Sequence, residues 1–219
     1  MTYTLEVCVD SVASALAAKR GGADRLELCA DLIIGGTTPS LALVRQVKAK
    51  TGLPVRALLR PRFGDFCYDR YELAQMAETA AALVQAGADG IVTGVLTPEG
   101  ELDVDALRPI YAAARAAAKA AGHPIVCTLH RAFDVCKDPF AALEAAKALN
   151  LGTILTSGQA ASAPAGASLL RRLVEAAGPD LEILVGAGVT PANLPALAAE
   201  TGAHAFHMSG KQVLDSRMT

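Results

Sequence analysis

Short apolar runs rich in β-branched residues alternate with longer alanine-rich stretches along the whole chain. Turn or polar residues bound each short run, a pattern typical of buried strands. The runs predict eight strands, at 4–9, 25–29, 55–59, 90–94, 125–130, 153–157, 182–186 and 204–208. The stretches between them predict helices. In the first of these, Ser11 suits an N-cap and the Gly21-Gly22 pair suits a left-handed C-cap.

Eight strands that alternate with helices indicate parallel βα units. An open doubly wound sheet usually has fewer strands and often has a glycine-rich turn after its first strand, where this chain has Asp10 and Ser11. The pattern therefore predicts an α/β fold, a (β/α)8 TIM barrel, as a single domain over 1–219. The sequence ends soon after the eighth strand, so we expect the eighth helix to be missing or truncated.

Composition narrows the range of partners. The net charge of -2 gives no electrostatic basis for binding nucleic acid or an anionic membrane. No basic segment precedes an apolar run at the N-terminus, and no apolar stretch reaches the roughly 18 residues of a membrane span. We therefore expect a cytoplasmic protein that binds neither nucleic acid nor membranes. The five cysteines are widely scattered and odd in number, which favours reduced thiols over disulfides.

The period of two along a strand selects the side chains that face the barrel interior. In the first predicted strand, Glu6 and Cys8 share the inward face, and in the second strand Glu27 and Cys29 do. A buried carboxylate needs a partner. The expected partners are the arginines that follow the third and fifth strands, namely Arg60, Arg62 and Arg131.

The ends of the strands carry most of the candidate chemistry, as expected for the active end of a TIM barrel. After the third strand, Arg60 and Arg62 offer planar donors for a carboxylate or phosphate, and Asp65 is placed to fix one of them. Arg131 and Ser157 follow the fifth and sixth strands and are further candidates for substrate binding.

Proton transfer has four candidate residues. His130 and Asp134 after the fifth strand are spaced for an acid–base pair, although a buried structural histidine explains His130 equally well. Glu6 and Glu27 suit acid–base work or a hard divalent cation. A structural ion-pair network is the favoured alternative for these two carboxylates, because arginines roughly balance them.

A glycine turn after the seventh strand predicts an anion site. Gly186 and Gly188 in "GAGVT" leave backbone N–H groups free ahead of a helix. In many TIM barrels the loops after strands seven and eight bind phosphate, and Ser209 in "MSGK" would complete such a site.

Nine segments in order along the chain closely resemble the CutC copper homeostasis family: "LEVCVDS", "ADRLELCA", "GGTTPS", "RPRFGDFCY", "GIVTGVLTPEGELD", "LHRAFD", "LTSGQ", "GAGV" and "HMSG". The resemblance implies a cytoplasmic TIM barrel that forms a homo-oligomer, with a dimer favoured. It also implies a link to copper homeostasis and binding of Cu(I). Cys8 and Cys29 occupy positions where members of that family also carry cysteine.

The sequence leaves two main functions open. Cys8 and Cys29 as a pair of thiolates would suit Cu(I), a soft ion, although buried cysteine is often only a small apolar filler. The alternative is a TIM-barrel enzyme of unknown reaction that acts on a small anionic metabolite held by Arg60 and Arg62. A non-catalytic binding module is a third possibility. Whether the protein is an enzyme is not decided by its sequence.

Overall fold

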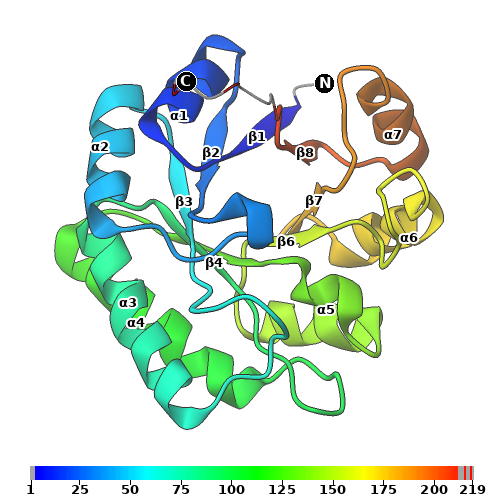
Figure 1. Cartoon of the computed structure of the whole chain (residues 1–219). Helices are drawn as coiled ribbons and strands as arrows, with labels where there is room; N and C mark the ends of the chain where they lie inside the picture. The colour runs from blue at the N-terminus through cyan, green and yellow to red at the C-terminus, as the bar shows by residue number, and fades with distance from the viewer. Residues whose placement is uncertain (1–2, 212–214, 216–217, 219) are drawn as a thin grey trace.

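The computed structural model describes residues 3–211, 215 and 218, and its eight parallel strands form a closed barrel in chain order (Figure 1). The strands are β1 (Thr4–Val9), β2 (Arg25–Leu28), β3 (Val55–Leu58), β4 (Gly90–Thr93), β5 (Val126–Leu129), β6 (Thr153–Thr156), β7 (Glu182–Val185) and β8 (Ala205–Met208). The predicted TIM barrel is confirmed, and all eight predicted strands are present.

Helices surround the barrel (Figure 1). They are α1 (Val12–Arg20), α2 (Leu41–Thr51), α3 (Arg70–Gln85), α4 (Val104–Ala121), α5 (Pro139–Ala148), α6 (Ala167–Ala177) and α7 (Leu194–Thr201), with short 3-10 turns η1 (Leu32–Ile34) and η2 (Arg131–Val135). Local signals set their ends. Ser11 caps α1 in a capping box with Ser14, and Asp69 and Glu72 do the same for α3. In the part of the chain that the structure describes, no helix is long and apolar enough to cross a membrane.

The predicted absence of an eighth helix concerns residues 209–219, of which 212–214, 216, 217 and 219 lie outside the described residues. Residues 209–211, 215 and 218, which are described, have no regular secondary structure. The interpretation of residues 1–219 as one domain stays a prediction.

The strands separate an outer layer of apolar side chains from a barrel interior that contains both apolar and charged side chains. Leu26 and Leu28 of β2 face outward into the main hydrophobic core, which also contains helix residues such as Val44 and Leu83. The interior holds two small apolar groups, Cys29 with Leu58 and Val92, and Leu155 with Leu184 and Ala205. A TIM barrel usually fills its interior with bulky apolar side chains. Here charged residues take several of those places.

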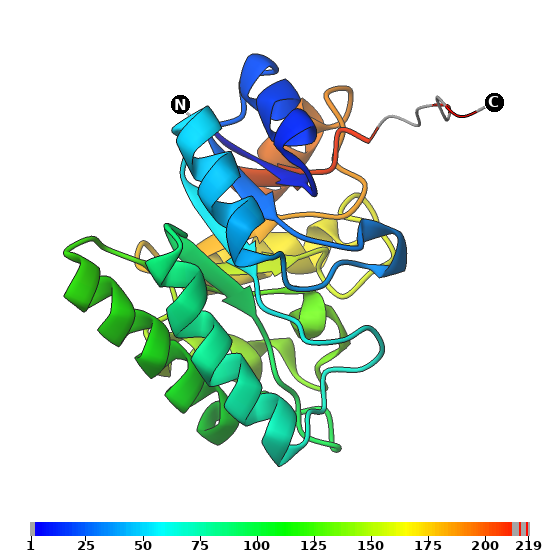
Figure 2. The same cartoon turned by 60° about the vertical axis from the view of Figure 1, so that its left-hand side comes forward.

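The carboxyl ends of the strands open on one end of the molecule, which we call the mouth. Figure 2 shows the segment after β2 and the β3–α3 loop extending from that end. The loops that carry most of the predicted chemistry therefore gather around one opening.

Candidate functional site

A network of charged side chains fills the amino-terminal half of the barrel interior. The carboxylate of Glu6, 1% exposed, accepts a hydrogen bond from Nε of Arg25 at 2.6 Å, and Nη1 of Arg56 lies 3.5 Å from it. Nη2 of Arg25 also lies 2.6 Å from Oε1 of Glu182. Nη1 of Arg56 donates to the Thr153 hydroxyl at 3.0 Å. These contacts offset the cost of burying the Glu6 charge.

The predicted arginine partners of the buried carboxylates were wrong. Glu6 pairs with Arg25 and Arg56 rather than with the three arginines expected from the strand ends, Arg60, Arg62 and Arg131. Those three follow their strands and interact within the loops of the mouth, above the level of Glu6. The alternation of inward and outward side chains along a strand predicts these partners, because Arg25 and Arg56 occupy inward positions of β2 and β3.

His207 of β8 connects the buried carboxylates of β1 and β2, a role that the sequence did not reveal. Its Nδ1 lies 2.9 Å from Oε1 of Glu6, and its Nε2 lies 3.7 Å from Oε2 of Glu27. Burial opposes the ionisation of Glu6, but the hydrogen bond and charge of His207, together with Arg25 and Arg56, lower its pKa to about 2. The side chain of His207 is 13% exposed, and this partial burial opposes its charge, yet its hydrogen bonds with Cys8 and Glu6 raise its pKa well above the ordinary value.

The thiols of Cys8 and Cys29 face each other inside the barrel, on the inward positions that the strand period predicts. Their Sγ atoms are 3.7 Å apart. Oε2 of Glu27 lies 3.6 Å from Sγ of Cys29. Within the described residues, these three form the one cluster of at least three cysteine, histidine or acidic side chains whose ligand atoms could hold a metal ion. We call Cys8, Glu27 and Cys29 the thiol cluster.

The three groups of the thiol cluster differ in their pKa values. The hydrogen bond with Cys29 lowers the pKa of Cys8 to about 5, against the effect of burial and with help from His207. The same hydrogen bond, together with burial, raises the pKa of Cys29 well above its ordinary value. Burial and the neighbouring Cys8 raise the pKa of Glu27 to about 8. At neutral pH the cluster thus holds one thiolate, at Cys8, next to a cationic His207.

Arg60 ties two loops of the mouth together. Its Nη1 donates to the carbonyls of Gly35 and Gly36 at 3.3 and 3.2 Å, and its Nη2 donates to the carbonyl of Gly64 at 2.8 Å. The guanidinium also lies over the ring of Phe66, 5.0 Å from its centroid. Arg60 is buried, so its position is fixed by the loops that it joins.

Arg62 and Asp65 organise the β3–α3 loop. Nε of Arg62 donates to Glu72 at 2.6 Å, and its Nη2 donates to Asp65 at 3.1 Å and to the Cys67 carbonyl at 2.8 Å. Asp65 does fix one of the two arginines, as predicted. The substrate-binding role of Arg62 and Asp65 stays a prediction, and in the structure their donors and acceptors serve the loop itself.

The structure does not form the predicted acid–base pair of His130 and Asp134. Nδ1 of His130 accepts a hydrogen bond from the Ala132 amide at 3.1 Å. Asp134 instead accepts from the Ser157 amide at 3.0 Å and from Nε of Arg131 at 2.7 Å. The short η2 turn aims Asp134 toward β6, away from the imidazole. Any proton-transfer role of His130, Asp134, Glu6 or Glu27 stays a prediction.

Arg131 and Ser157 meet at the mouth between β5 and β6. Nη2 of Arg131 donates to the hydroxyl of Ser157 at 3.3 Å. Oγ of Ser157 lies 3.0 Å from Oδ2 of Asp134 and 2.7 Å from the Ala160 carbonyl oxygen, and its single proton can be donated to either acceptor. Asp134 therefore gathers Arg131 and Ser157 into one bonded group, which holds the loops after β5 and β6 together.

The glycine turn after β7 is more closely packed than an open anion site requires. The Gly186 amide donates to the Thr156 carbonyl at 2.9 Å, and a Cβ at Gly186 would lie 2.6 Å from Leu155. Gly188 has a positive φ of 76°, which favours glycine. Helix α7 begins only at Leu194, several residues beyond this turn. Ser209 is exposed at the mouth after β8, and its anion-binding role stays a prediction with that of the glycines.

Comparison with known proteins shows the family to which this chain belongs. The model of the CutC family matches residues 3–212, and this chain belongs to that family. A CutC family protein of Vibrio vulnificus is 43% identical over 219 residues, covering 100% of this chain and 85% of the relative. The human copper homeostasis protein cutC homolog is 42% identical over 216 residues, covering 99% of this chain and 76% of the relative.

Solved structures give the same answer for the fold. The crystal structure of CutC from Streptococcus agalactiae superposes with a TM-score of 0.86 at 29% identity, covering 94% of this chain and 98% of that one. A phosphonomutase-like protein from Burkholderia cenocepacia superposes with a TM-score of 0.66 at 22% identity, covering 95% of this chain and 87% of that one. The second likeness shows the shared barrel and nothing about function.

Proposed function

We propose that this protein acts in copper homeostasis by binding Cu(I) through the thiols of Cys8 and Cys29. The observation that carries the proposal is the approach of these two sulfur atoms to 3.7 Å inside the barrel, one from β1 and the other from the residue directly after β2. Membership of the CutC family and the copper homeostasis name of the human relative support the choice of metal.

The thiol cluster fits the chemistry of Cu(I). Soft thiolates select Cu(I) over hard ions such as Mg²⁺. Two metal–thiolate bonds of about 2.3 Å each can span sulfur atoms up to roughly 4.6 Å apart, so one ion can reach both sulfurs without a strand moving. The carboxyl group of Glu27 lies within 4.8 Å of both sulfurs; it can act as a third ligand after it releases its proton, or as a neighbour that orients Cys29.

The surroundings of the two thiols also suit this role. Leu58 and Val92 pack against Cys29 on one side and keep it out of water, since Cys29 is only 1% exposed. His207 approaches from β8, which is paired with β1, and connects Glu27 to Glu6. The ligands therefore come from strands whose positions the barrel fixes, which limits how far the two sulfurs can separate.

The other functional predictions rest on the family resemblance, or on residues whose polar groups already form hydrogen bonds within the protein. The predicted cytoplasmic location and homodimer stay predictions. So does the alternative of an enzyme that acts on a small anionic metabolite. Arg62 and Asp134, two residues that such an enzyme would use, are already bonded within the protein.

The direct test is an anaerobic Cu(I) titration against a competing chelator, with the Cys8→Ala/Cys29→Ala protein beside the wild type. We expect one tightly bound ion in the wild type and loss of that ion in the double variant. Cys67→Ala is the matched control, because this thiol lies in the β3–α3 loop outside the cluster. Unchanged copper binding in a folded double variant, judged by circular dichroism, would refute the proposal.

A further inference from the structure

Three buried polar atoms at the mouth have no hydrogen-bond partner within the described residues. They are Nε of Arg60, Oη of Tyr68 and Nε2 of His130, and they are the unpartnered buried side-chain nitrogen and oxygen atoms of the described chain. A buried polar atom that loses water and gains no partner is unfavourable, so such atoms are rare in folded proteins. All three residues lie in the loops that follow β3 or β5. A single explanation for the three unpartnered atoms is therefore worth seeking.

Arg60 and His130 occupy matching positions on either side of β4. Each follows its strand on the side that faces the interior, in phase with Arg56 of β3 and Thr128 of β5, which contact each other. The residue at this level is Gly94, directly after β4, where an added Cβ would lie 2.8 Å from Nδ1 of His130. The glycine leaves the room that the imidazole occupies.

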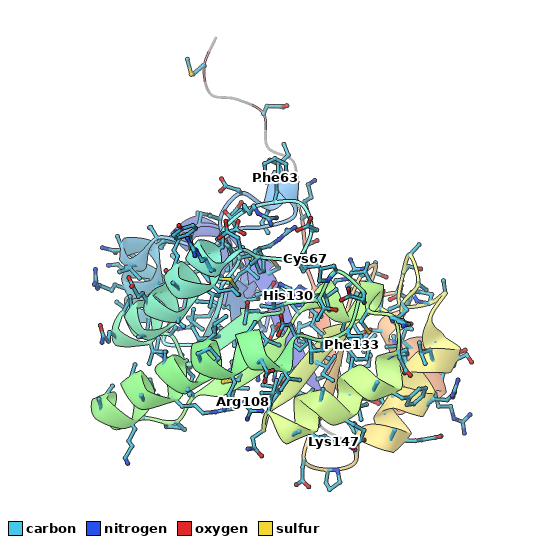
Figure 3. The ribbon with its side chains drawn as sticks, turned by 90° about the horizontal axis from the view of Figure 1, so that it is seen from below. Phe63, Cys67, Arg108, His130, Phe133 and Lys147 are labelled. Carbon is cyan, nitrogen blue, oxygen red and sulfur yellow. The ribbon has the colours of Figure 1, made fainter. Side chains whose placement is uncertain are left out.

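Phe66 brings the β3–α3 loop against both groups. Its ring centroid is 5.0 Å from Cζ of Arg60 and 4.8 Å from the centroid of the His130 ring. Figure 3 shows Phe63 at the edge of the molecule, with Cys67 and His130 successively further in. The loop thus covers the space next to His130, and Tyr68 belongs to the same loop.

The unpartnered atoms are hydrogen-bond donors. Because Nδ1 of His130 accepts from the Ala132 amide, the ring proton of the neutral imidazole sits on Nε2. Burial, followed by the charge of Arg60, lowers the pKa of His130 to about 3 and keeps the ring neutral. Nε of Arg60 can only donate, and the hydroxyl of Tyr68 is able to donate. Burial raises the pKa of Tyr68, whereas the charges of Arg60 and Arg62 and a close side-chain contact with Arg60 lower it, so the Tyr68 hydroxyl lies near the Arg60 guanidinium.

We propose that Arg60, Tyr68 and His130 form a binding site for a small oxyanion, a carboxylate or phosphate group, on the β3–β5 side of the mouth. A cationic guanidinium with two further donors calls for a ligand that accepts hydrogen bonds and carries negative charge. Arg62 is excluded from this site because Glu72, Asp65 and the Cys67 carbonyl already take its donors. The proposed site shares no residue with the thiol cluster, and the proposal does not depend on copper.

Entry of the anion requires the β3–α3 loop to shift, because all three donor atoms are buried. Phe66 is half-buried and lies against two of the three residues, so it forms the apolar wall of the site. A ligand held there would contact the loop and the end of β5 together.

The test uses calorimetric titration of the full, metal-free chain with inorganic phosphate in one arm and malonate in the other. We expect saturable one-to-one binding of at least one of them, and the stronger arm identifies phosphate or carboxylate as the preferred group. Tyr68→Phe should weaken that binding about tenfold, because it removes one donor from the site. Tyr71→Phe, which alters an exposed tyrosine nearby, should leave binding unchanged.

A second measurement follows the donor atom itself. The Nε2–H signal of His130, assigned by its loss in His130→Gln, should move as the anion is added to ¹⁵N-labelled protein. The titrations extend to about 50 mM anion, so they detect even sites with millimolar dissociation constants. If neither anion binds in this range, the proposal is overturned. Binding that Tyr68→Phe leaves unchanged, or that leaves the Nε2–H signal in place, would overturn it too.

Discussion

His207 and Glu6 join the last strand of the barrel to the first, with Nδ1 of His207 2.9 Å from Oε1 of Glu6. The two residues are paired in the register of β8 and β1, so the contact lies across the seam where the barrel closes. The same carboxylate holds Arg25 and lies near Arg56. Three cationic groups, those of Arg25, Arg56 and His207, thus converge on the buried carboxylate of Glu6.

Replacement of Glu6 should be among the most destabilising single changes in this protein. Glu6→Ala leaves Arg25 and Arg56 buried with less compensation, and breaking a buried ion pair in this way costs about 3–5 kcal/mol. Urea denaturation followed by circular dichroism measures the free energy of unfolding. Glu144→Ala is the matched control, because its ion pair with Lys147 lies at the surface and should contribute little. Equal effects of the two changes would contradict this account of the network.

Glu27 should tune copper binding rather than determine it. Glu27→Gln keeps the shape of the side chain but removes the carboxylate that lies 3.6 Å from Sγ of Cys29. We expect the affinity for Cu(I) to fall by roughly 10- to 100-fold, the usual effect of losing a group that orients a metal ligand. Chelator competition under anaerobic conditions gives this value. A loss as complete as that of the double cysteine variant would make Glu27 an essential ligand instead.

Acid should destabilise the protein partly through His130. Its pKa is about 3 in the folded chain, below the ordinary value of 6.5. Between these two values the unfolded chain binds a proton that the folded chain does not, so stability falls as the pH drops from about 6.5 toward 3. The slope from this one group reaches at most about 1.4 kcal/mol per pH unit.

The variant His130→Gln isolates that contribution. Urea denaturation of both proteins across this pH range should show a smaller loss of stability in the variant, since glutamine does not titrate. Parallel curves for the two proteins would mean that His130 is protonated in the folded state.

Gly94 should resist substitution. A Cβ at this position would lie 2.8 Å from Nδ1 of His130 and 2.9 Å from Cβ of Ala132, both closer than van der Waals contact. Overpacking of this kind costs about 1–3 kcal/mol, so Gly94→Ala should lower the midpoint of thermal unfolding by several degrees. Gly21→Ala is the control, because Gly21 has an ordinary φ of -77° and its nearest neighbour to an added Cβ is 3.4 Å away. A drop of the same size in both proteins would argue against a special role for Gly94.

The sequence correctly predicted the features that depend only on the alternation of side chains along a single strand. The inward positions of Glu6, Cys8, Glu27 and Cys29 follow from alternation, and the structure brings the two thiols together as adjacent inward strand positions require. The barrel itself followed from counting βα units. Both inferences are local, since each needs only the order of residues within a strand or between neighbouring strands.

Several features of the site depend on geometry that no local sequence pattern carries. His207 reaches Glu6 because the barrel closes, and the register between β8 and β1 depends on all the strands between them. Asp134 turns toward Ser157 because η2 is a short 3-10 turn whose direction is set by packing rather than by residue spacing. The unpartnered donors of Arg60, Tyr68 and His130 likewise become visible only when the β3–α3 loop is in place.

The central claim is that one Cu(I) ion binds between the thiols of Cys8 and Cys29. X-ray absorption at the copper edge of the anaerobic, one-to-one Cu(I) protein tests it most directly, because it identifies the ligand atoms. We predict two sulfur ligands in the wild type, and their loss from the spectrum of the Cys8→Ala/Cys29→Ala protein. A first shell of nitrogen and oxygen alone in the wild type, or sulfur ligands that persist in the double variant, would contradict the claim.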